Sequence, residues 1–165
     1  MLLDYAAGLM YQSSTAVSDM RVNSVPIHGF LEDYVFVIQA LFDLYEATLN
    51  PSWLEWAVQL QHKQDELFWD PKGFAYFSTE AADPSLLFRM KDDQDGAEPS
   101  PNSVAVSNLL RAASYTDHEE FVKKAGQILT VFSERLVKIP VVLPEMARAT
   151  AAFYLTLKQV LCWAG

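Results

Sequence analysis

The sequence contains a single cysteine, Cys162, so it has no intrachain disulfide and no Cys-x-x-Cys redox or zinc motif. We interpret Cys162 as a small apolar residue near the end of the last helix rather than as a reactive thiol. Basic residues are also scarce, since 12 Lys and Arg against 21 Asp and Glu give a net charge of −9. Binding to a phosphate backbone needs clustered Lys and Arg, so this composition argues against nucleic-acid binding.

Long apolar runs are missing as well. The most apolar segment, residues 146–163, is interrupted by Arg148 and Lys158, so no stretch of about 18 apolar residues is suited to cross a bilayer. The first residues, Met-Leu-Leu-Asp, bring an early acid and no basic region, which is unlike a signal peptide. We therefore expect a cytoplasmic protein with no membrane contact.

The residues that are present predict a packed core. The sequence is 51% hydrophobic and 13% aromatic, and 165 residues are enough for one domain. Residues 1–28 follow neither a helical nor an alternating pattern, so we predict a partly ordered lead-in there and a folded domain over 29–165.

Hydrophobic periodicity predicts an all-α domain with one small β-hairpin. The expected helices cover 31–49, 51–69, 102–114, 117–137 and 145–162, and residues 140–144 are expected to be extended. Runs 74–78 and 86–91 have the composition of two short paired strands. Ser100 followed by Pro101 predicts a helix start, with Asn102 as a competing cap, and Asp117 with Glu120 has the spacing of a capping box.

The predicted helices alternate in character along the chain. Helices 31–49, 102–114 and 145–162 are apolar on nearly every side, whereas 51–69 and 117–137 are amphipathic. This alternation is typical of a two-layered helical ring, whose inner helices are covered on one side and face a lumen on the other. A narrow polar stripe on the first helix must then face either water or an internal cavity; it consists of Glu32, Gln39, Asp43 and Glu46.

An acidic loop over residues 89–103 leads into the third predicted helix, and its carboxylates suit the positive end of that helix dipole. An EF-hand is excluded, because with Gly96 at the sixth position Lys91 falls at the first and Asn102 at the twelfth. The histidines at 28, 62 and 118 lack metal-ligand spacing. We therefore predict neither a metal site nor a cofactor.

Four separated motifs resemble the spermatogenesis-associated protein 20 family. They are Gly-Phe-Leu-Glu-Asp-Tyr at 29–34, Leu-Tyr-Glu-Ala-Thr at 44–48, Gln-Asp-Glu-Leu-Phe-Trp-Asp at 64–70 and Lys-Asp-Asp-Gln-Asp-Gly-Ala-Glu-Pro-Ser at 91–100. The resemblance implies a six-hairpin glycosidase-like α/α toroid, which in the family follows a thioredoxin-like domain. That domain is not found here, and about two and a half hairpins are expected instead of six. We therefore expect a partial toroid, a C-terminal fragment or short isoform, with some apolar inner surface left uncovered.

The same resemblance implies that a ligand would lie in the lumen, near the N-termini of inner helices. It makes Glu32, Asp33, Asp93 and Glu98 candidate catalytic carboxylates, and Asp92, Asp95, Asn102 and Tyr34 candidate ligand-binding residues. Paired carboxylates are what glycoside hydrolysis requires. The competing interpretation is that these acids cap helices and solvate a loop.

Two functions remain open. One is a noncatalytic or degenerate toroid that binds a protein partner or the remainder of the toroid, with the role in spermatogenesis and fertility that the family name implies. The other is a carbohydrate-active enzyme, a glycoside hydrolase or sugar epimerase, acting on a small carbohydrate. We favour the first, because catalysis of this kind needs groups held to fractions of an ångström and half a ring does not close a lumen.

Overall fold

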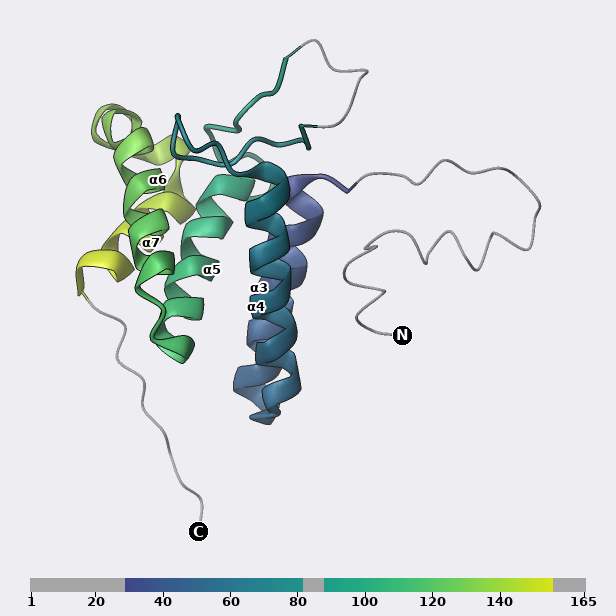
Figure 1. Cartoon of the computed structure of the whole chain (residues 1–165). Helices are drawn as coiled ribbons and strands as arrows, with labels where there is room; N and C mark the ends of the chain where they lie inside the picture. The colour runs from purple at the N-terminus through teal and green to yellow at the C-terminus, as the bar shows by residue number, and fades with distance from the viewer. Residues whose placement is uncertain (1–28, 82–87, 156–165) are drawn as a thin grey trace, which may run out of the picture.

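The computed structural model describes residues 29–81 and 88–155 (Figure 1). The predicted lead-in at 1–28 and Cys162 lie outside these residues. The elements of the described part are five α-helices and a short 3₁₀ turn: α3 (Leu31–Thr48), α4 (Pro51–Phe68), α5 (Pro101–Thr116), α6 (Glu119–Lys138), η1 (Pro140–Val142) and α7 (Pro144–Leu155). The prediction of an all-α fold is confirmed.

Two helices begin where the sequence signals place them. Ser100 caps α5, its hydroxyl accepting a hydrogen bond from the amide of Ser103 at 3.3 Å, and Pro101 is the first helical residue. Asn50 caps α4 in the same way through the amide of Ser52, at 3.1 Å. Both caps are followed by proline, whose missing N–H is no loss at a first helical position.

The helices form two layers (Figure 1). In the inner layer α5 packs against α3 on one side and α7 on the other, while α4 covers α3 and α6 covers α5 in the outer layer. Links of two residues, between α3 and α4 and between α5 and α6, make each pair an antiparallel hairpin. This is the alternation of inner and outer helices expected for part of an α/α toroid. It explains why the N-terminal part of α5 is covered on all sides: residues 101–110 are all buried, including the polar Asn102, Ser103, Ser107 and Asn108.

The predicted β-hairpin is not seen, because the backbone of Tyr76, in the middle of the run 74–78, pairs with a side chain instead of a second strand. The amide of Tyr76 donates to Oδ1 of Asn102 at 2.9 Å, and Nδ2 of Asn102 donates to the carbonyl of Tyr76 at 3.0 Å. The side chain of Asn102 thus takes the place of a neighbouring strand. Among the described residues, Trp69 and Tyr76 form an isolated antiparallel bridge, and Ser78 bonds to the carbonyl of Met90 at 2.8 Å. Part of the second predicted strand, 86–87, lies outside the described residues.

Two local predictions between α5 and α7 are also wrong. Asp117 ends α5 instead of capping α6: its φ of 55° is left-handed and its amide donates to the carbonyl of Ala113 at 3.0 Å. An N-cap needs extended backbone, so that position falls to His118. Residues 140–142, expected to be extended, form the 3₁₀ turn η1, which brings Pro144 to the start of α7.

None of the helices within residues 29–81 and 88–155 combines the length and the hydropathy needed to cross a bilayer.

The two hydrogen bonds between the side chain of Asn102 and the backbone of Tyr76 give a first prediction. Asn102→Ala leaves the amide and carbonyl of Tyr76 unpaired in a position with 0% exposure. We expect the free energy of unfolding, measured in urea, to fall by about 2–4 kcal/mol, since each buried unsatisfied backbone group costs roughly 1–3 kcal/mol. Asn50→Ala, which removes only an exposed helix cap, should cost about 1 kcal/mol. Equal losses in the two variants would contradict this account.

Candidate functional site

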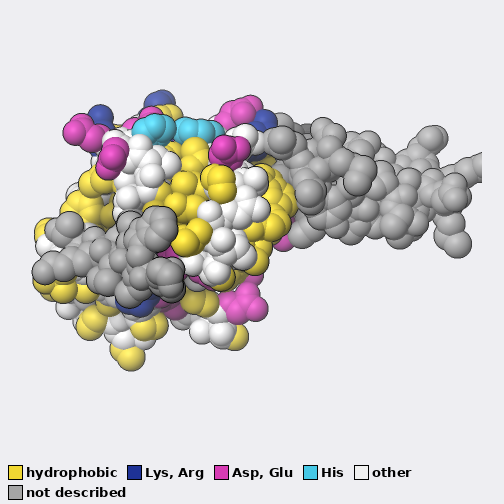
Figure 2. Space-filling view, turned by 90° about the horizontal axis from the view of Figure 1, so that it is seen from below, with side chains coloured by type: hydrophobic (Ala, Val, Ile, Leu, Met, Phe, Trp, Pro, Cys, Tyr) yellow, Lys and Arg dark blue, Asp and Glu magenta, His cyan; other side chains and the backbone are white. Residues whose placement is uncertain are grey.

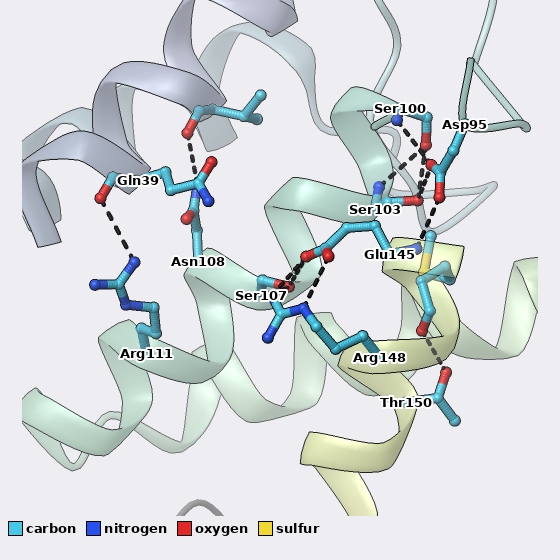
Figure 3. Close-up of polar contacts among 12 residues, drawn as sticks. Gln39, Asp95, Ser100, Ser103, Ser107, Asn108, Arg111, Glu145, Arg148 and Thr150 are labelled. Atoms are coloured by element: carbon cyan, nitrogen blue, oxygen red, sulfur yellow. Dashed lines mark hydrogen bonds and ion pairs between the residues drawn. The ribbon is translucent and has the colours of Figure 1, made fainter. Parts of the chain in front are cut away.

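Asp95 holds the N-terminal turns of α5 and α7 together (Figure 3). Its Oδ1 accepts hydrogen bonds from the amide of Ser100 and the hydroxyl of Ser103, both at 2.8 Å, and its Oδ2 accepts from the amide of Glu145 at 2.9 Å. The carboxylate therefore lies at the positive ends of two helix dipoles and satisfies donors of both helices. Its bonds have a structural purpose, and Asp95 does not line the cleft described below.

Two of the candidate catalytic acids have structural partners of their own. Oδ2 of Asp33 accepts a hydrogen bond from the amide of Phe30 at 2.9 Å, which ties down the start of α3. Asp93 forms an ion pair with Arg135 of α6. Both members of that pair are well exposed, so the pair adds little stability but joins the acidic loop to the outer layer.

The other two candidate catalytic acids meet at a cleft of about 340 Å³ between the start of α3 and the loop before α5. Glu32 comes from the first turn of α3, Glu98 from the loop, and the two side chains share a hydrogen bond. Partial burial, and after it the bond to Glu98 and the nearby negative charges, raise the pKa of Glu32. The cleft is lined by Glu32, Met90, Lys91, Asp92, Asp93, Gln94, Glu98, Pro99, Ser100 and Pro101.

The geometry of this pair limits its chemistry. Two carboxyl groups that share a hydrogen bond have oxygens about 2.5–3 Å apart. Retaining glycosidases keep their two carboxyl groups about 5–5.5 Å apart, and inverting ones farther. The neighbouring Asp92 is also engaged, since its Oδ2 accepts a hydrogen bond from the hydroxyl of Ser78 at 2.8 Å. As arranged, the pair is suited to bind a cationic group.

Tyr34 and Asn102, predicted to bind a ligand, are not among the cleft residues. Tyr34 is 3% exposed and meets the edge of Phe68, with ring centroids 5.2 Å apart. Burial, and after it nearby acidic charges, raise the pKa of Tyr34 to about 12. Asn102 is fully buried and its amide is engaged with Tyr76.

The structure also gathers polar residues on the inner layer that were not predicted as a site. Arg111 of α5 reaches α3, where it pairs with Asp43 at 2.8 Å and Glu46 at 2.9 Å, and donates to the carbonyl of Gln39 at 3.5 Å. The polar stripe of α3 faces water, as one of the two predicted alternatives had it: Asp43 and Glu46 are 64% and 53% exposed, and Arg111 pairs with both. The signal in the sequence that could have indicated this cluster was Arg111, an arginine within a helix predicted to be mostly apolar.

A second group of the same kind joins α5 to α7 (Figure 3). The hydroxyl of Ser107 donates to Oε1 of Glu145 at 2.8 Å, and Arg148 bonds to Ser107 at 3.0 Å and to both carboxylate oxygens of Glu145 at 2.8 and 2.6 Å. The acids and the arginines of the inner layer are thus paired with one another. Such a surface has charged groups but little local net charge.

Two histidines lie on the outer layer. His62 of α4 and His118 stack beside Phe121, with ring centroids 5.5 and 5.7 Å away. Histidine side chains gather at one edge of the face shown in Figure 2, where acidic side chains also lie. No group of three or more His, Cys, Asp or Glu side chains in the part of the chain that the structure describes is placed to hold a metal ion.

Asp95 and Asp93 lie in the same loop, and we expect their removal to lower the stability of the fold by different amounts. Asp95→Ala deletes the acceptor of three hydrogen bonds at two helix N-termini. We expect the free energy of unfolding in urea to fall by about 3 kcal/mol. Asp93→Ala deletes only an exposed ion pair and should cost less than about 1 kcal/mol. If both variants lost the same stability, Asp95 would not be the structural acid that its bonds suggest.

The comparisons with known proteins give close relatives by sequence. The chain is 56% identical to spermatogenesis-associated protein 20 of Mus musculus over 162 residues, which is 96% of this chain and 20% of the relative. It is 54% identical to spermatogenesis-associated protein 20 of Homo sapiens over 136 residues, 82% of this chain and 17% of the relative. An uncharacterized protein of Caenorhabditis elegans is 45% identical over 134 residues, 81% of this chain and 18% of the relative. The chain spans about one fifth of the length of the curated relatives it matches.

The other comparisons add less. No protein-family model matches the chain. Among solved structures, a glycosyl hydrolase family 88 protein from Bacteroides vulgatus has a TM-score of 0.44 and 13% identity, over 78% of this chain and 41% of that protein. This likeness is too low to support an argument about function. The sequence identities confirm the resemblance predicted from the motifs: over most of its length the chain is related to one segment of the spermatogenesis-associated protein 20 family.

Proposed function

We propose that the chain is a noncatalytic, partner-binding part of a six-hairpin glycosidase-like domain that acts in spermatogenesis. The observation that supports this best is that three of the candidate acids form hydrogen bonds or ion pairs within the fold. Asp95 holds two helix N-termini, Asp33 caps α3, and Asp93 binds Arg135. Carboxylates committed to such bonds are poorly placed to act on a substrate. The link to spermatogenesis comes from the name of the mammalian relatives.

The cleft with Glu32 and Glu98 is the surface that we assign to the partner. Its acidic pair lies beside Met90, which is 59% exposed, and the preceding segments expose Phe30 at 55% and Phe88 at 70%. Acidic groups next to exposed apolar side chains suit a partner segment that carries both basic and apolar residues. Exposed apolar side chains supply most of the binding energy in such contacts, and the charges supply orientation.

Affinity capture from testis extract tests this assignment. The double variant Glu32→Gln/Glu98→Gln removes the two glutamate charges of the cleft, and Met90→Ser removes an apolar contact. We expect a bound protein to be retained by the wild type, to be reduced at least about tenfold by either variant, and to elute as salt screens the charges. Glu134→Gln, on an exposed side chain outside the cleft, is the matched control.

Circular dichroism of each variant checks that it is folded. A set of captured proteins that is the same for the wild type, the cleft variants and the control would overturn the assignment of the partner to this cleft.

A second candidate, a carbohydrate-active enzyme, is favoured by one observation. Glu32 and Glu98 come from separate elements, share a hydrogen bond and lie in a cleft next to the start of an inner helix. A ligand or a shift of the loop that separated the two carboxyl groups would give an acid and a base facing one another.

Thermal unfolding in the presence of a panel of mono- and disaccharides, uronic acids included, separates the two functions. A sugar at about 100 times its Kd would stabilise the wild type by about 2.7 kcal/mol, which raises Tm by several degrees. The enzyme hypothesis requires such a sugar, and turnover that Glu98→Gln abolishes and Asp93→Asn retains. We expect no sugar to raise Tm, as the noncatalytic role requires.

A further inference from the structure

A second cleft, of about 550 Å³, adjoins the cleft with Glu32 and Glu98, which we call the acidic cleft. The second cleft lies between the loop before α5 and the C-terminal turns of α6, and we call it the α6 cleft. Lys91 and Asp93 line both clefts, so the two meet along these residues and form one continuous surface. The rest of the α6 cleft is supplied by α6 and its C-cap: Val131, Phe132, Glu134, Arg135, Lys138 and Ile139.

The two halves of this surface carry opposite charge. Apart from the two shared residues, the acidic cleft is lined by three acids and no basic side chain, whereas the α6 cleft is lined by two basic side chains and one acid. The three acids are Glu32, Asp92 and Glu98, and the two basic residues are Arg135 and Lys138. In a chain with a net charge of −9, a place where basic side chains outnumber acids differs from the average surface. A negative half and a positive half therefore lie side by side.

The basic side chains of the α6 cleft are held by exposed ion pairs, which leave them able to bind a further acid. Lys138, 67% exposed, pairs with Glu134 one turn earlier on the same helix. Exposed pairs of this kind contribute little, so a carboxylate from another chain displaces Glu134 at little cost. Arg135 pairs with Asp93 through Nη1. Its guanidinium has five N–H donors in a planar fork, so it accommodates a second acceptor while it stays paired with Asp93.

We propose that the partner segment carries an acidic residue beside its basic one, and that this acidic residue binds Arg135 and Lys138 in the α6 cleft. The inference rests on the proposed function, because it describes the partner that we assign to the acidic cleft. Each half also offers an apolar contact, Met90 in the acidic cleft and Ile139, 49% exposed, in the α6 cleft. A segment with basic residues alone is attracted by one half and repelled by the other, whereas a segment with both charges is held in one direction.

Fluorescence anisotropy with labelled synthetic peptides tests the proposal on the whole chain. The reference peptides carry Lys and Leu in a Gly-Ser background, and the test peptides add one Glu at each spacing from the Lys and on either side of it. We expect at least one Glu peptide to bind about three- to fivefold more tightly than the same peptide with Gln in that place. The gain should shrink as salt is added. General repulsion by a chain of net charge −9 predicts the opposite, a weaker binding of every Glu peptide.

Two variants locate the gain. Lys138→Glu should remove it and leave the reference peptides bound no more weakly than before. Lys123→Glu is the matched control, because Lys123 is an exposed lysine of the same helix that lines neither cleft, and its replacement changes the net charge by the same amount. This variant should keep the gain. Circular dichroism checks that both variants are folded.

The outcomes separate this inference from the proposed function. A Glu that brings no gain at any position, or a gain that Lys138→Glu leaves in place or Lys123→Glu removes equally, refutes the role of the α6 cleft. If the reference peptides are then still weakened by Glu32→Gln/Glu98→Gln, the acidic cleft remains the partner surface and only the further inference fails. If no peptide responds to Glu32→Gln/Glu98→Gln, the assignment of the partner to the acidic cleft fails, and this inference fails with it.

Discussion

The burial of the α5 N-terminus is the constraint on which the rest of the structure depends. Residues 101–110 are all buried, so the first amides of this helix and the polar side chains among them have little access to water. Donors in such a place must be satisfied from within the protein, or each costs about 1–3 kcal/mol. Ser100, Asp95 and Asn102 meet that need, and in doing so they connect α5 to the loop, to α7 and to the run 74–78.

This constraint explains how far the sequence predicts the fold. Ser100 and Asn50 were predictable as caps, because an N-cap is a local arrangement within four residues. The β-hairpin was not, because the composition of a run indicates strand-like residues and not the partner of its backbone. Asn102, 26 residues away in the sequence, supplies that partner. Asp117 shows the same limit at short range, since capping spacing does not tell whether a residue ends one helix or begins the next.

The same limit applies to the candidate site, where only part of the arrangement was predictable from the sequence. The motifs placed acids near two inner-helix N-termini, and Glu32 and Glu98 do meet there. Asp95 is also acidic and lies in the same loop as Glu98, yet it is held between two helices. The distinction depends on the direction of each side chain across the packed layers. Spacing along the sequence does not contain that direction, because the loop is irregular and follows neither helical nor strand periodicity.

The arginines of the inner layer determine which of its charges are paired. Arg111 neutralises acids of α3, and Arg148 neutralises Glu145, so the inner layer joins its helices through paired charges. Asn108 adds a bond from Nδ2 to the carbonyl of Val35 at 2.8 Å (Figure 3), which fixes the register of α5 on α3. The charges of Arg111 and Arg148 are therefore paired within the layer, whereas Glu32 and Glu98 at the cleft have no basic partner among the ion pairs of the described residues.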